Sequence, residues 1–312
     1  MARSILLWIL ALLITLASAY YQRKTGPTYP VDGSVAVGDA TVHYSLTRSH
    51  GGDGDQTVPF RSDLAGVEGE IVYRRYKTDD AWRRAALTAE GDSLFATLPH
   101  QPPAGKLEYF VELERDGALV RVPDHESVVT RFKGAVPAGA LIPHVIAMFL
   151  AMFISTRAGL EALRREGRPR LQAIAGIVFL IIGGFIFGPI VQKYAFGEYW
   201  TGFPYGTDLT DNKTLIALLA WLIAMAAIWK KDALRTHPAR RWFVVAASVV
   251  MLLIFLIPHS MMGSEIDYKE MDRQKAAEKA RALEAAADSE ETAEPGIPST
   301  DEMPGQAGQE AP

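Results

Sequence analysis

Residues 193–213 read KYAFGEYWTGFPYGTDLTDNK, a polar and aromatic stretch set between two long apolar runs. Those runs, 171–191 and 214–229, contain no Asp, Glu, Lys or Arg. Spanning a bilayer takes about 20 apolar residues at 1.5 Å each, so both runs predict membrane-spanning helices. The stretch between them is therefore expected to lie at a membrane surface.

Three further apolar runs, at 4–19, 138–155 and 242–262, bring the expected spans to five. Residues 136–262 are predicted to form a four-helix membrane domain. Its spans are expected at about 138–156, 171–192, 213–230 and 241–262.

Residues 1–22 are either a signal anchor or a cleaved signal peptide. Ala17-Ser18-Ala19 matches the small-x-small pattern of a cleavage site. The length of the apolar run and Trp8 within it favour the anchor.

Charge in the short connections predicts the orientation, because Lys and Arg are retained on the cytoplasmic side. Residues 157–170 carry five Arg against two Glu, and residues 230–241 carry five Lys or Arg against one Asp. Both connections are thus expected inside. The region before 138, the 193–213 stretch and the C-terminus are expected outside, as in a bacterial inner-membrane protein.

Between residues 28 and 133, short alternating runs separated by Gly, Asp and Pro predict antiparallel strands and an exported β-sandwich. The fold class is therefore α+β. The expected strands are 34–37, 41–47, 56–59, 68–75, 94–97, 107–114 and 128–132.

Residues 72–113 resemble immunoglobulin-like or fibronectin type III modules of exported bacterial proteins. The resemblance is carried by Tyr73, Trp82, Phe95, Pro102 and Tyr109, at the places such modules use for core aromatics and for a turn. It implies a fold and no function.

The same region holds four histidines and an acidic turn, residues 51–55 (GGDGD). Their spacing matches no metal signature, and we expect a tight turn there rather than a calcium site. The four histidines are His43, His50, His100 and His125.

Composition excludes several classes of site. The chain has no cysteine, so it has no disulfide, thiolate metal site or covalent haem attachment. The net charge of −4 argues against nucleic-acid binding. No hydrolase, kinase or phosphate-loop motif is present. An enzymatic role is left open, and a non-enzymatic one is favoured.

Two histidines lie in the expected spans, His144 near the outer end of one and His259 near the outer end of another. At 1.5 Å per residue both lie within about 10 Å of the outer surface. Matched depth is what bis-histidine haem ligation requires. The alternative for each is a polar side chain bonded to a neighbouring helix.

Residues 196–202 (FGEYWTG) and the string Trp221-Leu222-Ile223 resemble, with the two flanking histidines, the tryptophan-rich loop of the haem-handling membrane proteins of cytochrome c maturation. The chain departs from that pattern at Phe196, in lacking a Trp-Asp pair and in an insertion at 202–206. The resemblance implies a site for haem b. Four aromatic side chains are candidates to stack on its ring: Tyr199, Trp200, Phe203 and Tyr205. The alternative is an aromatic belt at the bilayer surface.

Acidic side chains in the same stretch have two interpretations. Glu198, Asp208 and Asp211 supply oxygen ligands that could hold a cation. Capping of the following helix by Asp208 and Asp211 is the favoured alternative. Lys193 and Lys213 are also candidates to pair with these acids. In the preceding span, Gly183-Gly184 and Gly188-Pro189 predict close helix packing and a kink.

Residues 263–289 predict an exposed helix, and residues 290–312 an acidic disordered tail. The leading functional hypothesis is a redox or haem-handling site on the outer side. The alternative is a non-catalytic scaffold anchored in membrane lipid that binds exported proteins through its β-sandwich and tail. A small transporter is disfavoured because no charged residue lies in the middle of a span.

Overall fold

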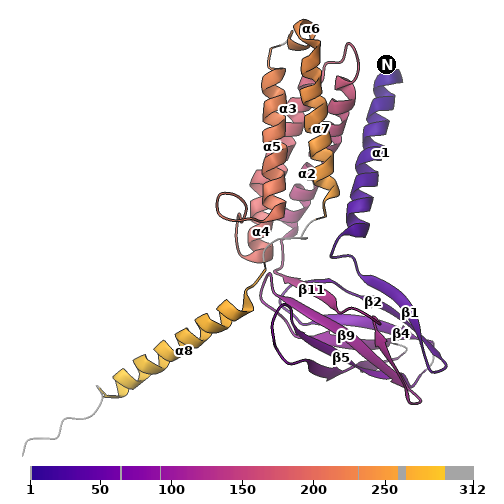
Figure 1. Ribbon diagram of the computed structural model, residues 1–312, viewed down its shortest axis with the longest axis vertical. Coiled ribbons are helices and arrows are strands. Elements are labelled where there is room, and N and C mark those ends of the chain that lie inside the picture. The colour runs from indigo at the N-terminus through magenta and orange to yellow at the C-terminus, as the bar shows by residue number, and fades with distance from the viewer. Residues whose placement is uncertain (1, 64, 92, 231, 259–264, 292–312) are drawn as a thin grey trace, which may run out of the picture. The chain divides into compact units, whose positions relative to one another are not determined.

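The computed structural model describes residues 2–63, 65–91, 93–230, 232–258 and 265–291. The chain divides into two compact units, 1–266 and 267–312, which are treated separately. The first unit combines a strand-rich region with a bundle of helices (Figure 1), so the α+β prediction is confirmed. Residues 259–264 and 292–312, which include His259 and the predicted tail, lie outside the described residues.

The strand-rich region contains every strand that the sequence predicts, together with four short strands that it did not. The additional strands are β3, β6, β7 and β10. The described strands are β1 (Val31–Val37), β2 (Ala40–Leu46), β3 (Ser49–Gly51), β4 (Gln56–Ser62), β5 (Glu68–Arg75), β6 (Arg83–Ala86), β7 (Thr88–Glu90), β8 (Ser93–Leu98), β9 (Lys106–Arg115), β10 (Ala118–Val122) and β11 (Val128–Lys133).

These strands form two sheets. One has the order β1-β2-β4-β8-β7, and the other has the order β3-β11-β9-β5-β6 with β10 also paired to β9. The pairings are antiparallel except for β11 with β3, which is parallel. The register is set by the alternation of side chains, since β4 buries Gln56, Val58 and Phe60 and turns the residues between them outward.

Both sheets contribute to one buried core. Phe60 and Leu98 enter it from the first sheet, and Ile71, Tyr109 and Phe132 enter it from the second. The Tyr109 hydroxyl donates to the carbonyl of Thr47 at 2.8 Å, which satisfies its polar atom inside the core. Burial holds the pKa of Tyr109 above its usual value.

The helical region of the first unit contains one unusual element, a π-helix between α3 and α4. Together α3, the π-helix and α4 form one continuous helix, Arg170–Phe196. The helices are α1 (Ala2–Thr25), α2 (Ala138–Ala162), α3 (Arg170–Leu180), the π-helix η1 (Ile181–Phe187), α4 (Gly188–Phe196), α5 (Leu209–Ala227), α6 (Ala233–Thr236), the 3₁₀ turn η2 (Pro238–Arg240) and α7 (Arg241–Leu256).

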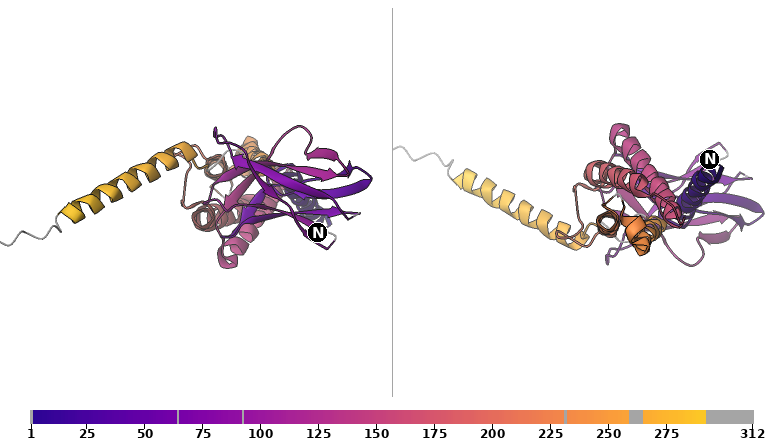
Figure 2. Two further views of the ribbon diagram at one scale, coloured as in Figure 1. Left: turned by 90° about the horizontal axis from the view of Figure 1, so that it is seen from below. Right: turned by 90° about the horizontal axis from the view of Figure 1, so that it is seen from above.

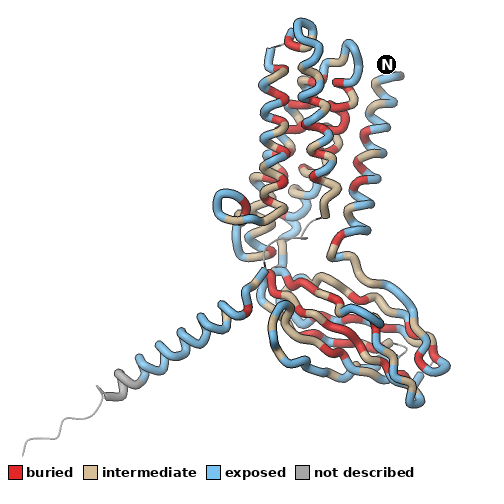
Figure 3. Tube along the Cα trace, in the orientation of Figure 1, coloured by how far each residue is buried: buried red, intermediate tan, exposed pale blue. Residues whose placement is uncertain are grey.

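Five described helices are long and apolar enough to cross a membrane. They run alongside one another, with α1 at the edge of the group (Figures 1 and 2). Each of these helices has both buried and exposed positions (Figure 3). Large apolar side chains such as Ile142 and Leu219 are among the exposed ones. An apolar exterior of this kind suits lipid rather than water.

Small residues let the helices approach closely. A side chain at Gly159 of α2 would lie 2.3 Å from the Ser248 hydroxyl of α7, so only glycine fits there. The same hydroxyl donates to the carbonyl of Ser155 at 2.9 Å. Close backbone approach with a polar cross-link is typical of helix pairs in membranes.

A buried ion pair ends α2. Arg157 lies 2.7 Å from Glu161, and both side chains are almost fully buried. Arg157 also lies over the ring of Trp8, which joins α1 to this cluster. The sequence placed Arg157 in a connecting loop after about residue 156, but the helix continues to Ala162 because Glu161 compensates the arginine charge within it.

The second unit is described by one helix, α8 (Tyr268–Glu291). Its described side chains are largely exposed from residue 269 to 286. Gln274 donates to Glu270 one turn earlier, a contact that supports a helix without a packed core.

We expect Glu161→Gln to lower the free energy of unfolding by about 3 kcal/mol, because it leaves the buried Arg157 charge without its partner. Thermal unfolding of the detergent-purified chain measures the change. Glu166→Gln, at an exposed position in the next turn, is the matched control and should have little effect. Equal melting temperatures for the two variants would contradict the assignment.

Candidate functional site

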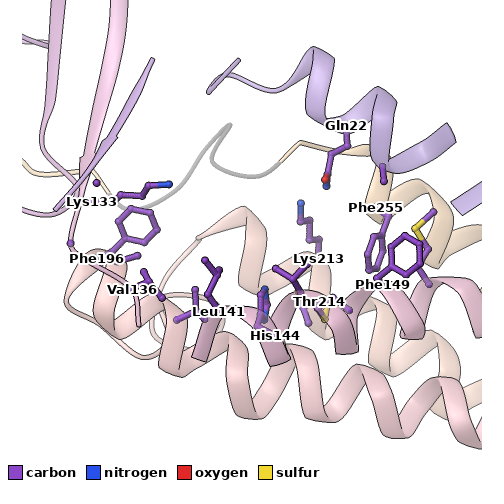
Figure 4. Close-up of a pocket in the computed structure, with 18 of the residues that line it drawn as sticks. Gln22, Lys133, Val136, Leu141, His144, Phe149, Phe196, Lys213, Thr214 and Phe255 are labelled. Atoms are coloured by element: carbon purple, nitrogen blue, oxygen red, sulfur yellow. The ribbon is translucent and has the colours of Figure 1, made fainter. Parts of the chain in front are cut away.

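A cavity of about 730 Å³ lies where the helices meet the strand-rich region. Figure 4 shows Lys133 and Phe196 at one end, Phe149 and Phe255 at the other, and His144 between them. Leu141 and Val145 line the cavity and are also exposed, so it is accessible and not sealed. Its walls come from α1, α2, α4, α5, α7 and the segments around β3 and β11.

His144 is oriented by the π-helix. Its Nδ1 lies 2.9 Å from the carbonyl oxygen of Gly183, which can only accept, so Nδ1 carries the proton. The same carbonyl accepts the backbone N–H of Gly188, the i+5 bond of the π-helical turn. Nε2 is thereby left as an acceptor, and it has no hydrogen bond to any residue that the structure describes.

Gly183 and Gly184 allow this contact by bringing three helices together. A side chain at Gly183 would lie 2.8 Å from the Met148 sulfur of α2, and one at Gly184 would lie 2.6 Å from the Thr214 methyl of α5. The glycine pair therefore serves close packing, as its composition predicts. The irregularity in this helix is a π-helical turn, a feature common at functional sites.

A buried cation lies beside His144. Lys213 of α5 is 5% exposed, and its ammonium group donates to the carbonyl of Ile257 at 2.9 Å. Gln22 of α1 donates to the same carbonyl at 3.4 Å, and Figure 4 shows its side chain pointing toward Lys213. The expected pairing of Lys213 with the loop acids is not observed among the described residues. Instead, Lys213 holds the end of α7 beside α1.

The strand-rich region contacts the helices at the end of the cavity where Lys133 and Phe196 lie (Figure 4). The guanidinium of Arg131 stacks on Phe196 at 4.6 Å, and the N–H of Gly134 donates to the carbonyl of Ala195 at 3.0 Å. Beyond α7, Glu265 pairs with both Lys77 and Lys106 at 2.8–2.9 Å. These hydrogen bonds lower the pKa of Glu265 against the opposing effect of its burial.

Asp208 and Asp211 organise the loop between α4 and α5. The Asp208 carboxylate accepts from the backbone N–H groups of Thr210 and Asp211, so it caps α5 as the sequence suggested. Asp211 is buried and accepts from the Thr201 N–H at 2.7 Å and from Gln192 at 3.1 Å. One carboxylate caps the helix, and the other ties the loop back to α4.

The four loop aromatics do not line the cavity that contains His144. Trp200 stacks on Phe185 at 5.7 Å, and its indole N–H donates to the carbonyl of Phe203. Tyr199, Phe203 and Tyr205 are exposed, Tyr205 to 84%. The loop closes on itself through Asp211 and Asn212, which directs these rings outward.

A metal site from Glu198, Asp208 and Asp211 is not assembled. Within the described ranges no group of three His, Cys, Asp or Glu residues is arranged to hold a metal ion. In the strand-rich region the rings of His50 and His100 both contact the carbonyl of Gly54, and the 51–55 segment forms a turn. His43 and His125 lie apart from them on exposed positions.

Several residues that line the cavity were not identified from the sequence. A usable signal was present, because His144, Met148 and Met152 recur every four residues and so share one face of α2. Gln22, Lys213, Phe149 and Phe255 come from helices far apart in the chain, and nothing in the local sequence brings them together.

We expect Asp211→Ala to release the loop, since it removes the buried acceptor of the Thr201 N–H and of Gln192, at a cost of roughly 2 kcal/mol. Hydrogen exchange should become faster across residues 197–208. Glu198→Ala, in the same loop, is the control and should leave exchange unchanged. Unaltered protection in Asp211→Ala would contradict the anchoring role.

A search of protein-family models finds no match to the chain, and a search of curated proteins finds no significant similarity. The likeness of the loop to haem-handling proteins and of residues 72–113 to immunoglobulin-like modules therefore stays a prediction from the sequence. The functional argument rests on the cavity and on the side chains that line it.

Proposed function

We propose that this chain is a bacterial inner-membrane protein whose cavity around His144 binds haem b or a related redox ligand, for electron transfer or haem handling. Support for a membrane location comes from five helices of sufficient length and apolarity. A ligand held near a membrane surface would be within reach of an exported partner.

In the proposed topology the two sheets form an exported β-sandwich, with the C-terminus on the same side. The basic connections at 157–170 and 230–241 support this orientation, because such loops are retained inside. The shared core of the two sheets supports the sandwich. The cavity would then lie at the outer membrane surface.

The state of His144 is the observation that carries the proposal. Histidine ligands to metals usually donate their second ring nitrogen to a carbonyl or carboxylate, which fixes the tautomer and the ring. The Nδ1 of His144 donates to the carbonyl of Gly183 in this way. Its Nε2 has no hydrogen bond to a residue that the structure describes, so its lone pair is available to a metal.

The remaining lining suits a large apolar ligand. Phe149 and Phe255 supply aromatic surface, Met148 and Met152 supply adaptable thioethers, and ligand cavities commonly measure about 300–1,000 Å³. Haem would supply one-electron redox chemistry, and these side chains would hold it and exclude water. The ring-stacking role predicted for Tyr199, Trp200, Phe203 and Tyr205 passes in this proposal to Phe149 and Phe255.

Haem iron can take a second axial ligand from the protein. His259 is predicted from the sequence to lie at the depth of His144, but it falls outside the described residues. The proposal requires His144 and does not depend on His259.

We expect the detergent-purified chain to shift the Soret band of added haemin. His144→Ala should abolish the shift, because it removes the Nε2 that would ligate the haem iron. His43→Ala, at an exposed strand position, is the control and should bind as the parent does. His259→Ala should change the band from six-coordinate to five-coordinate if that residue is the second ligand. An identical Soret band in His144→Ala and the parent chain would refute the proposal.

The alternative proposal is a non-catalytic scaffold that binds exported proteins. The observation that favours it is α8, whose described side chains from 269 to 286 are largely exposed, so the helix offers surface to a partner. Cross-linking through the strand-rich region or α8 that captures one stable partner, without any bound prosthetic group, would favour the scaffold.

A further inference from the structure

The lysine side chains that line the cavity around His144 have no acidic counterpart in the described part of its lining. Two lysines, Lys133 and Lys213, are among the described residues that line it, and no aspartate or glutamate is. Ligand cavities are usually apolar with a few polar groups that fix orientation, and here the charged groups share one sign.

Lys213 is the more constrained of the two. Its ammonium has three donors and makes one hydrogen bond, to Ile257, within the described part of the chain. No carboxylate there lies within ion-pair distance, although the Asp208 charge acts on it from farther away. A buried cation without an adjacent anion is costly, so an anion from outside the chain would stabilise Lys213.

Lys133 extends the positive region toward the strands. Burial lowers its pKa, and the neighbouring charges of Arg131 and Arg23 lower it further. Its ammonium has no hydrogen bond or ion pair with the residues that the structure describes. Lys133 points into the cavity from its polar end in Figure 4.

The opposite end of the cavity is apolar. Met152 lies eight residues after His144 on α2, which places it about 12 Å deeper along the helix. Phe149, Phe255 and Ile254 complete that end. A ligand of this cavity therefore needs an anionic group for Lys213 and an apolar body for Phe149 and Met152.

We propose that the ligand of this cavity is an anionic amphiphile, whose carboxylate or phosphate pairs with Lys213 and is attracted from farther away by Lys133, while its apolar body reaches Phe149 and Met152. The inference rests on the proposed function in using the same cavity. It adds that an anionic group is required. The propionates of a porphyrin and the head group of an acidic lipid both satisfy that requirement.

The test uses cis-parinaric acid and its methyl ester, which share an apolar chain and differ in charge, with the full chain in a neutral detergent. We expect the acid to bind about tenfold more tightly than the ester, as a charge-assisted hydrogen bond allows. Lys213→Met should remove most of that preference. Lys193→Met, at an exposed position in the last turn of α4, is the matched control and should keep it.

Lys133→Met provides a second test at a side chain that is more exposed than Lys213, and it should reduce the preference in the same direction. Equal affinity of the parent chain for acid and ester would overturn the inference. An unchanged preference in both folded variants, Lys213→Met and Lys133→Met, would also overturn it.

Competition separates the two sources of the anion. If haemin displaces parinaric acid and neither lipid does, the anion is a porphyrin carboxylate. If phosphatidylglycerol displaces it and phosphatidylcholine does not, the anion is a lipid head group. Equal displacement by both lipids would overturn the need for an anion.

The result is distinguishable from failure of the proposed function. If the acid is preferred and haemin gives no Soret shift, the anion site stands and the haem proposal fails. If a Soret shift depends on His144 and the acid is not preferred over the ester, the haem proposal stands and the anion site fails.

Discussion

The hydrogen bond from His144 to the carbonyl of Gly183 connects α2, the π-helix and the cavity. It requires α2 and the π-helix to lie in contact, which the absence of a side chain at Gly183 permits. It also uses the carbonyl that the π-helical turn shares with Gly188. One bond thus fixes the imidazole, its tautomer and the start of α4, which leads into the loop.

The cavity depends on a second constraint, the end of α7. Lys213 and Gln22 meet at the carbonyl of Ile257, so α1, α5 and α7 are held together by polar atoms at one level. On the other side, Arg131 and Gly134 attach the strands to α4. Polar contacts at the cavity therefore join three helices to one another and the strands to a fourth, and the ligand proposals follow from this arrangement.

The aromatic loop has a different role from the one its composition suggests. Two of its carboxylates have structural roles, since Asp208 caps α5 and Asp211 accepts from the Thr201 N–H. Its one tryptophan stacks on Phe185 and donates to the Phe203 carbonyl. What is left on the surface is Tyr199, Phe203 and Tyr205. Rings of this kind, next to the ends of apolar helices, suit the water–lipid boundary.

The sequence by itself determined the α+β class, the five apolar helices and the seven main strands, because these follow from periodicity and from composition within single segments. It also singled out His144 as a candidate ligand. The strands β3, β6, β7 and β10 were not predicted, because each is only three to five residues long, too short for an alternating pattern to show. In addition, β3 is defined by its pairing with β11, far away in the chain. Only the tertiary structure decided that His144 faces Lys213 and Phe255 and not Tyr199 or Trp200. The physical reason is that a cavity is formed by side chains from separate helices, and helix packing is settled by glycine contacts and buried hydrogen bonds that no local pattern records.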